Sequence, residues 1–340
     1  MVFNGKLRRL LKIVDIIIPT FRARGTLPAA LDSLVAQTKK MFIVTVVQDC
    51  DGEDYSDIIE EYKRRGLKVR LIQTEKNGGP GAARQRGMDS DKMSEFFMFM
   101  DADDILNPRA VEILSREIKL HNADLATSDF LVNEKADIPT YMSVDNTPCT
   151  WCHGKIYRAQ YLRDKNIRFF PGLRLNEDSY FNLVATNCTK KRIKIREVTY
   201  IWNQQNNSLT HKDGIIGFHV KSWEQYIFSQ VQGLLDIVDR NGEVDPALVA
   251  ATLINVYTHH MKALCGNVAP LCKVEDFRSA AEELKRLTRS PEVSSALKSK
   301  DFWNYICENL KASEMFDGNL VFYKMRFCDW LKEYLWEEIR

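Results

Sequence analysis

Two hydrophobic patterns alternate along the first hundred residues of the chain. One is a short run of β-branched, aliphatic or aromatic residues, typical of a strand buried on both faces, and it predicts strands at 14–19, 43–47, 69–72 and 96–100. The other places apolar residues three and four positions apart, and it predicts helices at 27–37, 57–65 and 82–88. This alternation indicates an α/β fold with a mostly parallel, Rossmann-like sheet flanked by helices.

The pattern changes twice farther along the chain. Residues 110–207 are mixed, with a helix predicted at 111–121, a strand at 124–130, and aromatic-rich irregular stretches. From residue 218 onward the chain predicts helices almost throughout, at 218–239, 246–265, 274–288, 294–312 and 320–339. We therefore expect two domains, an α/β domain over residues 1–213 and a C-terminal α-helical domain over residues 214–340.

Composition narrows the class of protein. Of the 340 residues, 45% are hydrophobic and 28% are charged, as in soluble globular chains, which argues against disorder and collagen-like structure. No run approaches the roughly 18 consecutive apolar residues that a membrane-spanning helix needs. Residues 1–12 are basic but lack the apolar stretch of a secretory signal. We expect a cytoplasmic protein, either free or at the inner face of the membrane.

Charge is nearly balanced over the whole chain, with 48 basic and 46 acidic residues, which argues against a general affinity for nucleic acid. Its distribution is uneven. Residues 1–213 carry 33 basic and 28 acidic residues, whereas residues 214–340 carry 15 and 18. The α/β domain is therefore the place to search for an anionic ligand.

The eight cysteines are too sparse for a disulfide scaffold, and we expect reduced thiols. Cys149 and Cys152, followed by His153, match the spacing of a haem attachment site. That modification occurs in exported proteins, and a zinc site would need a second ligand pair. A structural pair of partly buried thiols is the favoured interpretation.

Polar residues follow the predicted strands. Because ligands bind beyond the carboxyl ends of parallel strands, we expect one crevice to gather Pro19–Thr20, Asp49, 75–77 and Asp101–Asp104. Asp101 and Asp103 offer hard carboxylate oxygens on one turn, enough to hold Mg²⁺ or Mn²⁺ together with phosphate and water oxygens. The triplet alone favours an ordinary turn or a helix cap, with Asp104 starting the next helix.

A glycine-rich turn at 77–81 opens the third predicted helix, with Arg84 one turn inside it. The segment lacks the third small residue of a dinucleotide fingerprint and the Gly-Lys-Ser/Thr of a P-loop. Arg84 is placed for a phosphate or a nucleobase carbonyl, and a solvated arginine is the alternative. Glu177 and Asp178 follow an aromatic stretch that would raise a carboxyl pKa toward that of a general base. A helix-capping acid is the alternative there.

These segments occur in a recognisable order: DIIIPTF at 15–21, LDSLVAQT at 31–38, GAARQRG at 81–87, FMDADD at 99–104, GKIYR at 154–158 and ED at 177–178. Over roughly residues 13–211 the chain resembles the family 2 glycosyltransferases of GT-A fold. One segment departs from the family's pattern. Its paired aspartates and glycine-serine after the second strand are replaced here by residues 48–52, so Asp49 and Asp51 are both candidates to contact the base.

The resemblance implies an inverting enzyme that transfers a sugar from a nucleotide sugar, most often a UDP-sugar, to a hydroxyl acceptor. It implies that Pro19, Thr20, Arg84 and either Asp49 or Asp51 surround the nucleobase. These are the residues that the family places around the donor base.

The resemblance also assigns the reacting groups. Asp101 would contact the ribose side of the nucleotide, and Asp103 would bind a Mn²⁺ or Mg²⁺ ion that bridges the two phosphates. Asp178 would be the general base, with Glu177 beside it. These roles fit the chemistry, because a cation stabilises the departing diphosphate and one carboxylate on the opposite face suffices to deprotonate the acceptor.

Two further segments are assigned by position. Ser208 and His211 lie where many relatives place a segment that closes over the diphosphate. Ser208 is therefore a candidate phosphate contact and His211 a candidate metal ligand, with a polar interdomain turn as the alternative. Trp151 and Lys155 are expected to shape the acceptor side, and a core tryptophan is the alternative for Trp151.

Residues 214–340 lie outside the resemblance. The last predicted helix carries aromatic residues among four basic and four acidic ones, without the cationic face of a membrane-surface helix. We expect it to pack on the catalytic domain or on a second copy of the chain, which makes the chain a candidate homo-oligomer.

Two other classes of function compete with this interpretation. A nucleotidyltransferase that forms nucleotide sugars needs a basic, glycine-rich loop after the first strand, which residues 21–25 copy only weakly. A non-catalytic carbohydrate-binding protein is disfavoured by intact Asp101, Asp103 and Asp178. The acceptor stays open between a carbohydrate polymer, a lipid-linked sugar, a protein and DNA. Nucleic acid is the least supported, because the helical domain is net acidic.

Overall fold

The computed structural model describes residues 14–134, 140–144, 150–204, 216–265, 278–314 and 327–339. The chain divides into two compact units, which we call the N-terminal unit (residues 1–211) and the helical unit (residues 212–340). Among the helices of the described ranges, none combines the length and the apolar character needed to cross a membrane.

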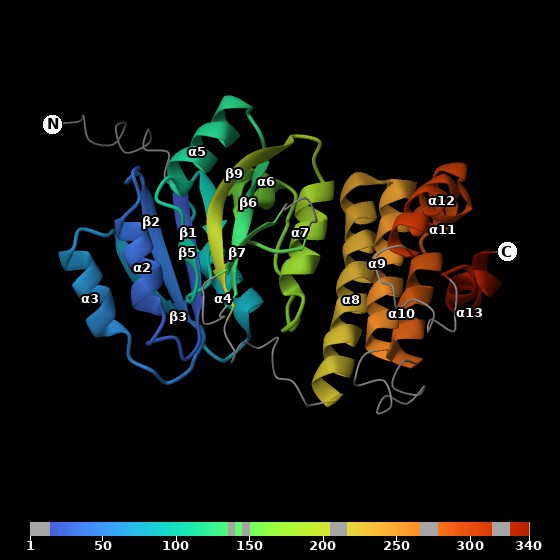
Figure 1. Ribbon diagram of the computed structural model, residues 1–340, viewed down its shortest axis with the longest axis horizontal. Coiled ribbons are helices and arrows are strands. Elements are labelled where there is room, and N and C mark those ends of the chain that lie inside the picture. Colours follow the sequence, from blue (N-terminus) through green and yellow to red (C-terminus); the bar gives the residue numbers. More distant parts are fainter. Residues whose placement is uncertain are drawn as a thin grey trace. The chain divides into compact units, whose positions relative to one another are not determined.

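The N-terminal unit is built on one mixed sheet with helices against it (Figure 1). Over the described residues the strand order is β3-β2-β1-β4-β8-β6-β9-β5, and β7 pairs with β6. The parallel half contains β1 (Val14–Thr20), β2 (Phe42–Gln48), β3 (Val69–Gln73) and β4 (Phe96–Phe99). Its connecting helices are α2 (Leu27–Val35), α3 (Ser56–Arg64) and α4 (Pro80–Ser90). The predicted parallel sheet with crossover helices is confirmed.

The other half of the sheet is largely antiparallel. Strand β8 pairs antiparallel with β4 and β6, β6 pairs parallel with β9, and β5 pairs antiparallel with β9. These strands are β5 (Ile105–Leu106), β6 (Leu125–Glu134), β7 (Thr140–Val144), β8 (Lys155–Arg158) and β9 (Arg192–Asn203). The helices of this region are α5 (Ala110–Leu120), α6 (Ala159–Asp164) and α7 (Glu177–Asn187). The sequence predicts α5 and β6 but not β8 or β9, because β8 is very short and β9 begins with exposed basic residues.

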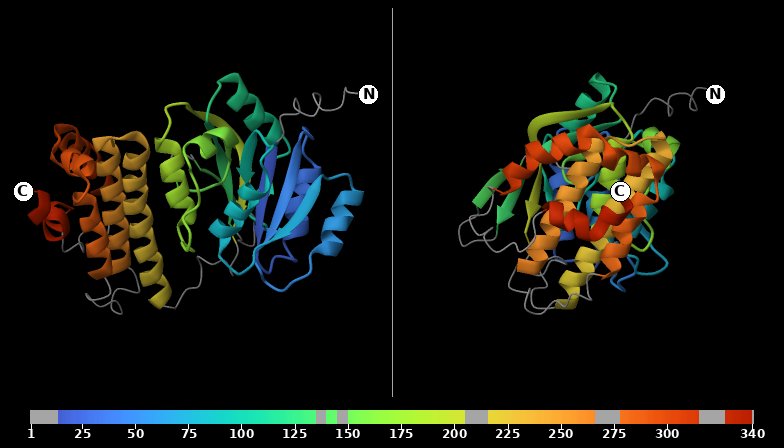
Figure 2. Two further views of the ribbon diagram at one scale, coloured as in Figure 1. Left: turned by 180° about the vertical axis from the view of Figure 1, so that it is seen from behind. Right: turned by 90° about the vertical axis from the view of Figure 1, so that its right-hand side faces the viewer.

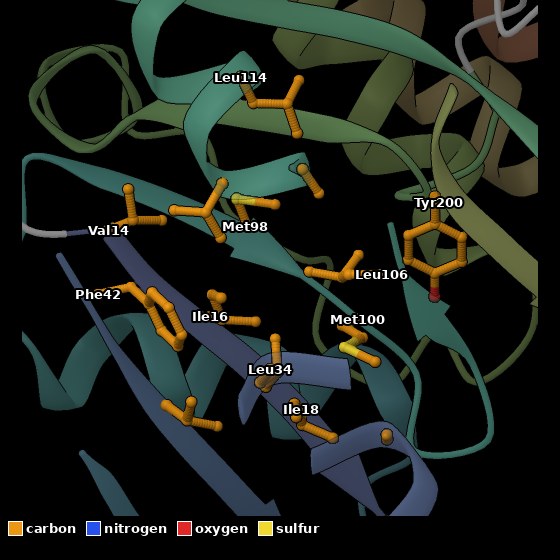
Figure 3. Packing of buried hydrophobic residues seen from close by; sticks show 14 of the residues in the cluster. Val14, Ile16, Ile18, Leu34, Phe42, Met98, Met100, Leu106, Leu114 and Tyr200 are labelled. Atoms are coloured by element: carbon orange, nitrogen blue, oxygen red, sulfur yellow. The ribbon is translucent and has the colours of Figure 1, made fainter. Parts of the chain in front are cut away.

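The core of this unit explains the continuous apolar runs of the parallel strands. Val14, Ile16 and Ile18 of β1 share one face of the sheet, where they pack with Leu34 of α2 and Leu114 of α5 (Figure 3). The opposite face is covered by α4, whose Gly87 approaches so closely that a Cβ there would lie 2.5 Å from Ile17. A strand that is buried on both faces is apolar at most successive positions, so it lacks the alternation of apolar and polar residues that is typical of a half-buried strand.

In the helical unit the helices are grouped together (Figure 2), and their buried apolar side chains form a core of their own. The described helices are α8 (Ile216–Asn241), α9 (Pro246–Cys265), α10 (Arg278–Thr288), α11 (Pro291–Lys298), α12 (Lys300–Glu314) and α13 (Phe327–Ile339). Buried side chains in this core include Ile227, Leu253, Phe302 and Trp330. The expectation of a helical C-terminal region is confirmed.

One detail of the helical unit differs from prediction. The helix predicted at 294–312 is two helices, because Ser299 has extended backbone and its Oγ accepts a hydrogen bond from the Phe302 N–H (3.1 Å), which favours a new helix start. The last helix, α13, buries Trp330 in the core of its own unit, where that ring meets Tyr257 of α9. Part of its apolar face is therefore buried within its own unit, and packing of this helix on the catalytic domain or on a second copy of the chain stays a prediction.

Candidate active site

The residues that follow β1 and β2 are tied together at the end of the sheet where both strands finish, which we call the carboxyl edge. The N–H of Asp49 donates to the carbonyl of Thr20 (2.9 Å), and the Thr20 hydroxyl donates to a β2 carbonyl (3.2 Å). The buried carboxylate of Asp49 accepts from the N–H groups of Gly78 (3.0 Å) and Gly79 (2.7 Å) and from Thr74 Oγ1 (2.9 Å). Asp49 therefore fixes the glycine-rich turn in place.

Asp51 organises the loop that follows β1. Its Oδ2 accepts from the Arg22 N–H (2.7 Å) and from Tyr55 OH (2.7 Å), and its Oδ1 accepts from Gln48 Nε2 (2.6 Å) and the Glu53 N–H (3.0 Å). Burial opposes ionisation, but these donors together lower the pKa of Asp51. Arg22 has φ +52°, so Asp51 holds a left-handed backbone turn beside the end of β1.

The glycine-rich turn opens α4 and allows a close approach to α7. Gly79 is the N-cap and has φ +85°, a conformation that favours glycine. A Cβ on Gly81 would lie 2.8 Å from Glu177 Cγ. The small residues of this turn therefore let α4 and the first residue of α7 meet, one turn before Arg84.

Arg84 is buried and joins two acids that lie far apart in the sequence. Its Nη1 donates to Glu177 Oε1 (2.7 Å) and its Nη2 donates to Asp101 Oδ1 (2.6 Å). Within the described part of the chain, the buried Nε of Arg84 has no hydrogen-bond partner. Burial opposes ionisation of Asp101, but Arg84 and His153 overcome it and hold the pKa of Asp101 below its usual range. The guanidinium is thus the link between the β4 end and the start of α7.

The turn after β4, residues 101–104, which we call the acidic turn, is held by hydrogen bonds to residues of β9. Tyr200 OH accepts from the Asp101 N–H (3.1 Å) and donates to Asp104 Oδ2 (2.5 Å). Asn203 donates from its N–H to Asp104 Oδ1 (2.8 Å) and from Nδ2 to the Asp103 carbonyl (2.9 Å). Burial and the charges of Asp101 and Asp103 raise the pKa of Asp104 well above its usual value. Asp104 is therefore a buried anchor and not the start of a helix, since α5 begins at Ala110.

His153 completes a cluster of potential metal ligands on this turn. Its Nε2 lies 3.7 Å from Asp101 Oδ2 and 4.0 Å from Asp104 Oδ2, and its ring stacks on Tyr200. One ligand atom from each of Asp101, Asp104 and His153 lies within 4.8 Å of the others. Asp103 is half-buried on the same turn. A donor set dominated by carboxylates suits a hard divalent cation such as Mg²⁺ or Mn²⁺.

The two acids at the start of α7 have different environments. Glu177 is buried and paired with Arg84, whereas Asp178 is half-buried and its Oδ1 accepts from the Ser179 N–H (2.7 Å). Burial, followed by the charge of Glu177, raises the pKa of Asp178 to about 7. A carboxylate with this pKa is suited to accept a proton near neutral pH.

The remaining predicted residues are distributed unevenly. Lys155 is buried and its Nζ donates to the Trp151 carbonyl (2.5 Å), while the half-buried Trp151 ring packs edge-on against Phe130 of the core. That packing is the core role considered as the alternative for Trp151. Pro19 is half-buried and lies directly before Thr20, the last residue of β1. Ser208 and His211 lie outside the described residues.

Three residues of the cluster are not among the predicted ones: His153, Tyr200 and Asn203. The available signal for His153 was its place directly before the GKIYR segment. Tyr200 and Asn203 come from β9, whose contact with the acidic turn depends on the antiparallel pairing of β9 with β5. No local sequence pattern encodes that pairing.

Part of the N-terminal unit matches a known protein family. Residues 15–174, slightly less than half of the chain, match the family model described as glycosyl transferase family 2. Over this segment the chain is similar to that family. The segment ends just before Glu177 and includes the acidic turn, Arg84 and the glycine-rich turn, so most of the described carboxyl edge lies within the matched residues.

Curated proteins that are similar to this chain include two bacterial proteins. The chain is 25% identical over 222 residues to an uncharacterized glycosyltransferase, EpsJ, of Bacillus subtilis, which covers 59% of this chain and 64% of EpsJ. It is 29% identical over 184 residues to the poly(ribitol-phosphate) β-N-acetylglucosaminyltransferase TarS of Staphylococcus aureus, which covers 50% of this chain and 32% of TarS. The chain thus spans about one third to two thirds of the length of these relatives.

A solved structure extends the likeness in fold beyond the family segment. The crystal structure of S. aureus TarS 1–349 in complex with UDP-GlcNAc is similar with a TM-score of 0.64 at 20% identity, over 89% of this chain and 93% of that one. At this identity the likeness concerns the fold. It confirms a GT-A domain followed by a helical region.

Proposed function

We propose that this chain is an inverting glycosyltransferase that moves a sugar from a UDP-sugar to a hydroxyl acceptor. The observation that carries the proposal is the buried Arg84, which joins Asp101 of the acidic turn to Glu177, the neighbour of Asp178. The Arg84 side chain thereby links the turn that we assign to the cation with the start of α7, which carries the carboxylate that we assign as the general base. The family match supports a nucleotide-sugar donor, and the TarS structure with UDP-GlcNAc supports UDP as its nucleotide.

The donor base is assigned to the loops after β1 and β2. Asp49 and Asp51 hold these loops through backbone N–H groups, so each acts on the base site at least through the shape of the loop. We assign Pro19 and Thr20, at the end of β1, to the surface that contacts the base. Phe21, which follows directly, is 47% exposed and offers a ring face to a planar base.

A divalent cation, Mn²⁺ or Mg²⁺, is assigned to the acidic turn, with Asp103 as its main ligand. When bound there, the cation would stabilise the negative charge that develops on the leaving diphosphate. Asp101, Asp104 and His153 offer further ligand atoms, although Asp101 is also paired with Arg84 and Asp104 with Tyr200. Ser208 and His211 are retained from the sequence as candidate contacts to the phosphates and the cation.

Asp178 is assigned as the general base. Inversion requires the acceptor oxygen to attack opposite the leaving diphosphate while one carboxylate takes its proton. Glu177 is committed to Arg84, whereas Asp178 is half-buried and has a pKa of about 7. Arg84 and Glu177 act as positioning residues in this scheme. Trp151 and Lys155 remain our candidates for the acceptor side.

The acceptor is proposed to be a hydroxyl of a carbohydrate or polyol chain, free or lipid-linked. The support is the similarity to TarS, a poly(ribitol-phosphate) β-N-acetylglucosaminyltransferase. Nothing favours a nucleic-acid acceptor.

Calorimetric titration of UDP with and without Mn²⁺ tests the donor and metal assignments. The wild-type protein should bind UDP more tightly with Mn²⁺, and Asp103→Asn should lose that metal-dependent increment. Asp164→Asn, an exposed change on α6, is the matched control and should keep it. Metal-dependent UDP binding that survives in Asp103→Asn would refute the metal assignment. Equal binding of UDP, GDP and ADP would refute a base-reading site.

A screen of nucleotide sugars, read as release of nucleoside diphosphate, then separates the transferase from its two rivals. A nucleotidyltransferase would instead release pyrophosphate from UTP and a sugar 1-phosphate. A carbohydrate-binding protein would release neither.

A further inference from the structure

Large apolar side chains are exposed at four described positions, and three of these lie at one end of the N-terminal unit. Met41 (40% exposed) directly precedes β2, Met93 (80% exposed) lies in the turn before β4, and Leu120 (71% exposed) ends α5 shortly before β6. The strands β2, β4 and β6 run in the same direction in the sheet. Their preceding turns therefore share one edge, the amino edge, opposite the candidate active site.

Side-chain contacts bring the turns of the amino edge together. Lys119, next to Leu120, lies 3.7 Å from Glu95 Oε2 and above the ring of Phe96. Arg163 of α6 reaches the Ser94 carbonyl (3.5 Å). The end of α5, the turn before β4 and helix α6 are thus neighbours, so Leu120 and Met93 belong to one surface.

Exposed lysines lie at the same edge of the sheet as these apolar side chains. They occur in the turns that precede β2, β3, β4 and β9: Lys40, Lys68, Lys92, Lys190 and Lys191. We call this set, together with Met41, Met93 and Leu120, the amino-edge surface.

The acids in the same turns are already engaged. Asp91 is buried and accepts from the Met93 and Ser94 N–H groups, and Glu95 lies between Lys119 and Arg158. Asp124, in the turn before β6, accepts from the Thr189 hydroxyl (2.6 Å). The exposed charged side chains in the turns that precede these strands are therefore basic, while the neighbouring α6 exposes one acid, Asp164.

We propose that the amino-edge surface docks the N-terminal unit on an anionic lipid bilayer. Exposed apolar side chains beside lysines match the boundary between headgroups and acyl chains, where apolar burial and attraction to anionic lipids act together. A soluble polyanion would be complementary to the lysines alone and would leave Met93 and Leu120 in water. The charge and the apolar side chains together therefore favour lipid over a soluble polyanion.

Flotation of the full chain with vesicles tests the proposal. Vesicles of phosphatidylcholine with phosphatidylglycerol should carry the protein upward, and vesicles of phosphatidylcholine alone should not. The triple change Lys92→Gln, Lys190→Gln and Lys191→Gln should weaken partitioning about 100-fold, from the usual contribution of basic residues near an anionic membrane. A matched triple change of exposed residues in the helical unit, Arg289→Gln, Lys298→Gln and Lys300→Gln, should leave partitioning unchanged.

A second pair of changes separates lipid from soluble polyanion. Met93→Ser with Leu120→Ser should weaken vesicle binding about tenfold while leaving any binding to inorganic polyphosphate as it is. Vesicle binding that is unchanged by the lysine substitutions, or polyphosphate binding that matches vesicle binding and ignores the two serine substitutions, would overturn the proposal. Thermal unfolding of each variant checks that the fold is kept. The measurement requires no enzymatic turnover, so its failure would leave the proposed transferase function standing.

Discussion

The two edges of the sheet differ in whether their charged side chains are buried and paired or exposed to solvent. At the carboxyl edge, Arg84, Glu177 and Asp104 are buried, and each is hydrogen-bonded to a specific partner. At the amino edge, Lys92, Lys190 and other lysines are exposed. Buried charges interact strongly because water no longer screens them, whereas exposed charges act mainly through their sum. The same strands thus present a site in which single residues matter and a surface in which only the set matters.

The largest expected effect comes from Asp178→Asn at the carboxyl edge. Removal of a general base typically lowers turnover by about 10²–10⁴-fold, and binding of UDP should remain nearly normal because we assign this side chain to the acceptor and not to the nucleotide. Steady-state kinetics with a donor and acceptor found by screening measures it, with calorimetry of UDP as the control. Near-normal turnover in Asp178→Asn would place the base elsewhere.

The pH profile sharpens the same assignment. The base acts in its deprotonated form, and its pKa is raised to about 7, so kcat/KM should rise with pH below 7 by about tenfold per pH unit and level off above it. Initial rates between acidic and mildly alkaline pH measure this profile. A rate that is flat through pH 7 would contradict the raised pKa of Asp178.

The next effect compares single charges at the two edges directly. Arg84→Ala leaves Asp101 and Glu177 without their shared cation, and breaking a buried ion pair by removal of one partner costs about 3–5 kcal/mol in the free energy of unfolding. Lys92→Ala at the amino edge is exposed and should change that free energy by no more than about 0.5 kcal/mol. Urea denaturation measures both. Similar shifts of the urea midpoint for the two variants would show that buried charges at the carboxyl edge matter no more for stability than exposed charges at the amino edge.

A smaller effect concerns a buried acid inside the sheet. Burial raises the pKa of Asp15 from 3.8 to about 7, against the hydrogen bond from Thr45 and the charge of Arg70. An acid with a raised folded-state pKa contributes stability that is fully present below pH 3.8 and is lost as pH rises through about 7. Relative to Asp15→Asn, the wild-type protein should therefore become less stable across this window. Parallel stability curves for the two proteins would contradict the shift.

The smallest expected effect distinguishes the exposed apolar residues of the two edges. Phe21→Ala should weaken UDP binding about tenfold, as loss of a base-stacking ring does elsewhere. Leu120→Ala, at the amino edge, should leave UDP binding unchanged. Calorimetry at fixed Mn²⁺ measures both, and equal affinities for all three proteins would remove Phe21 from the base site.

The sequence predicts the parallel half of the fold well and the rest poorly, for a physical reason. In β1 and β4 burial on both faces leaves continuous apolar runs, so periodicity and burial agree. The four residues of β8, which begin with Lys155 and end with Arg158, give no periodic signal, and β9 is recognisable only through its pairing with β6. The break at Ser299 depends on a single side-chain hydrogen bond, which a hydrophobic pattern does not record.

The same distinction applies to the candidate site. Asp101, Arg84 and Glu177 could be named from their motifs, and the structure brings them together. Their mutual role could not, because the pairing of Arg84 with both acids depends on the packing of α4 against α7. His153, Tyr200 and Asn203 reach the acidic turn only through the antiparallel half of the sheet. Residues contributed by long-range pairing are those that local sequence reasoning misses.

The length of β1 sets a standoff distance. At about 3.3 Å per residue, its seven residues separate the two edges of the sheet by roughly 20 Å. If the amino-edge surface rests on lipid with the strands upright, the sugar-transfer site stands about that far above the headgroups. An acceptor hydroxyl held at the headgroup plane would then be out of reach, whereas a glycan or polyol chain several units long would extend to Asp178. The length of the strands would thereby select acceptors by how far they project from the membrane.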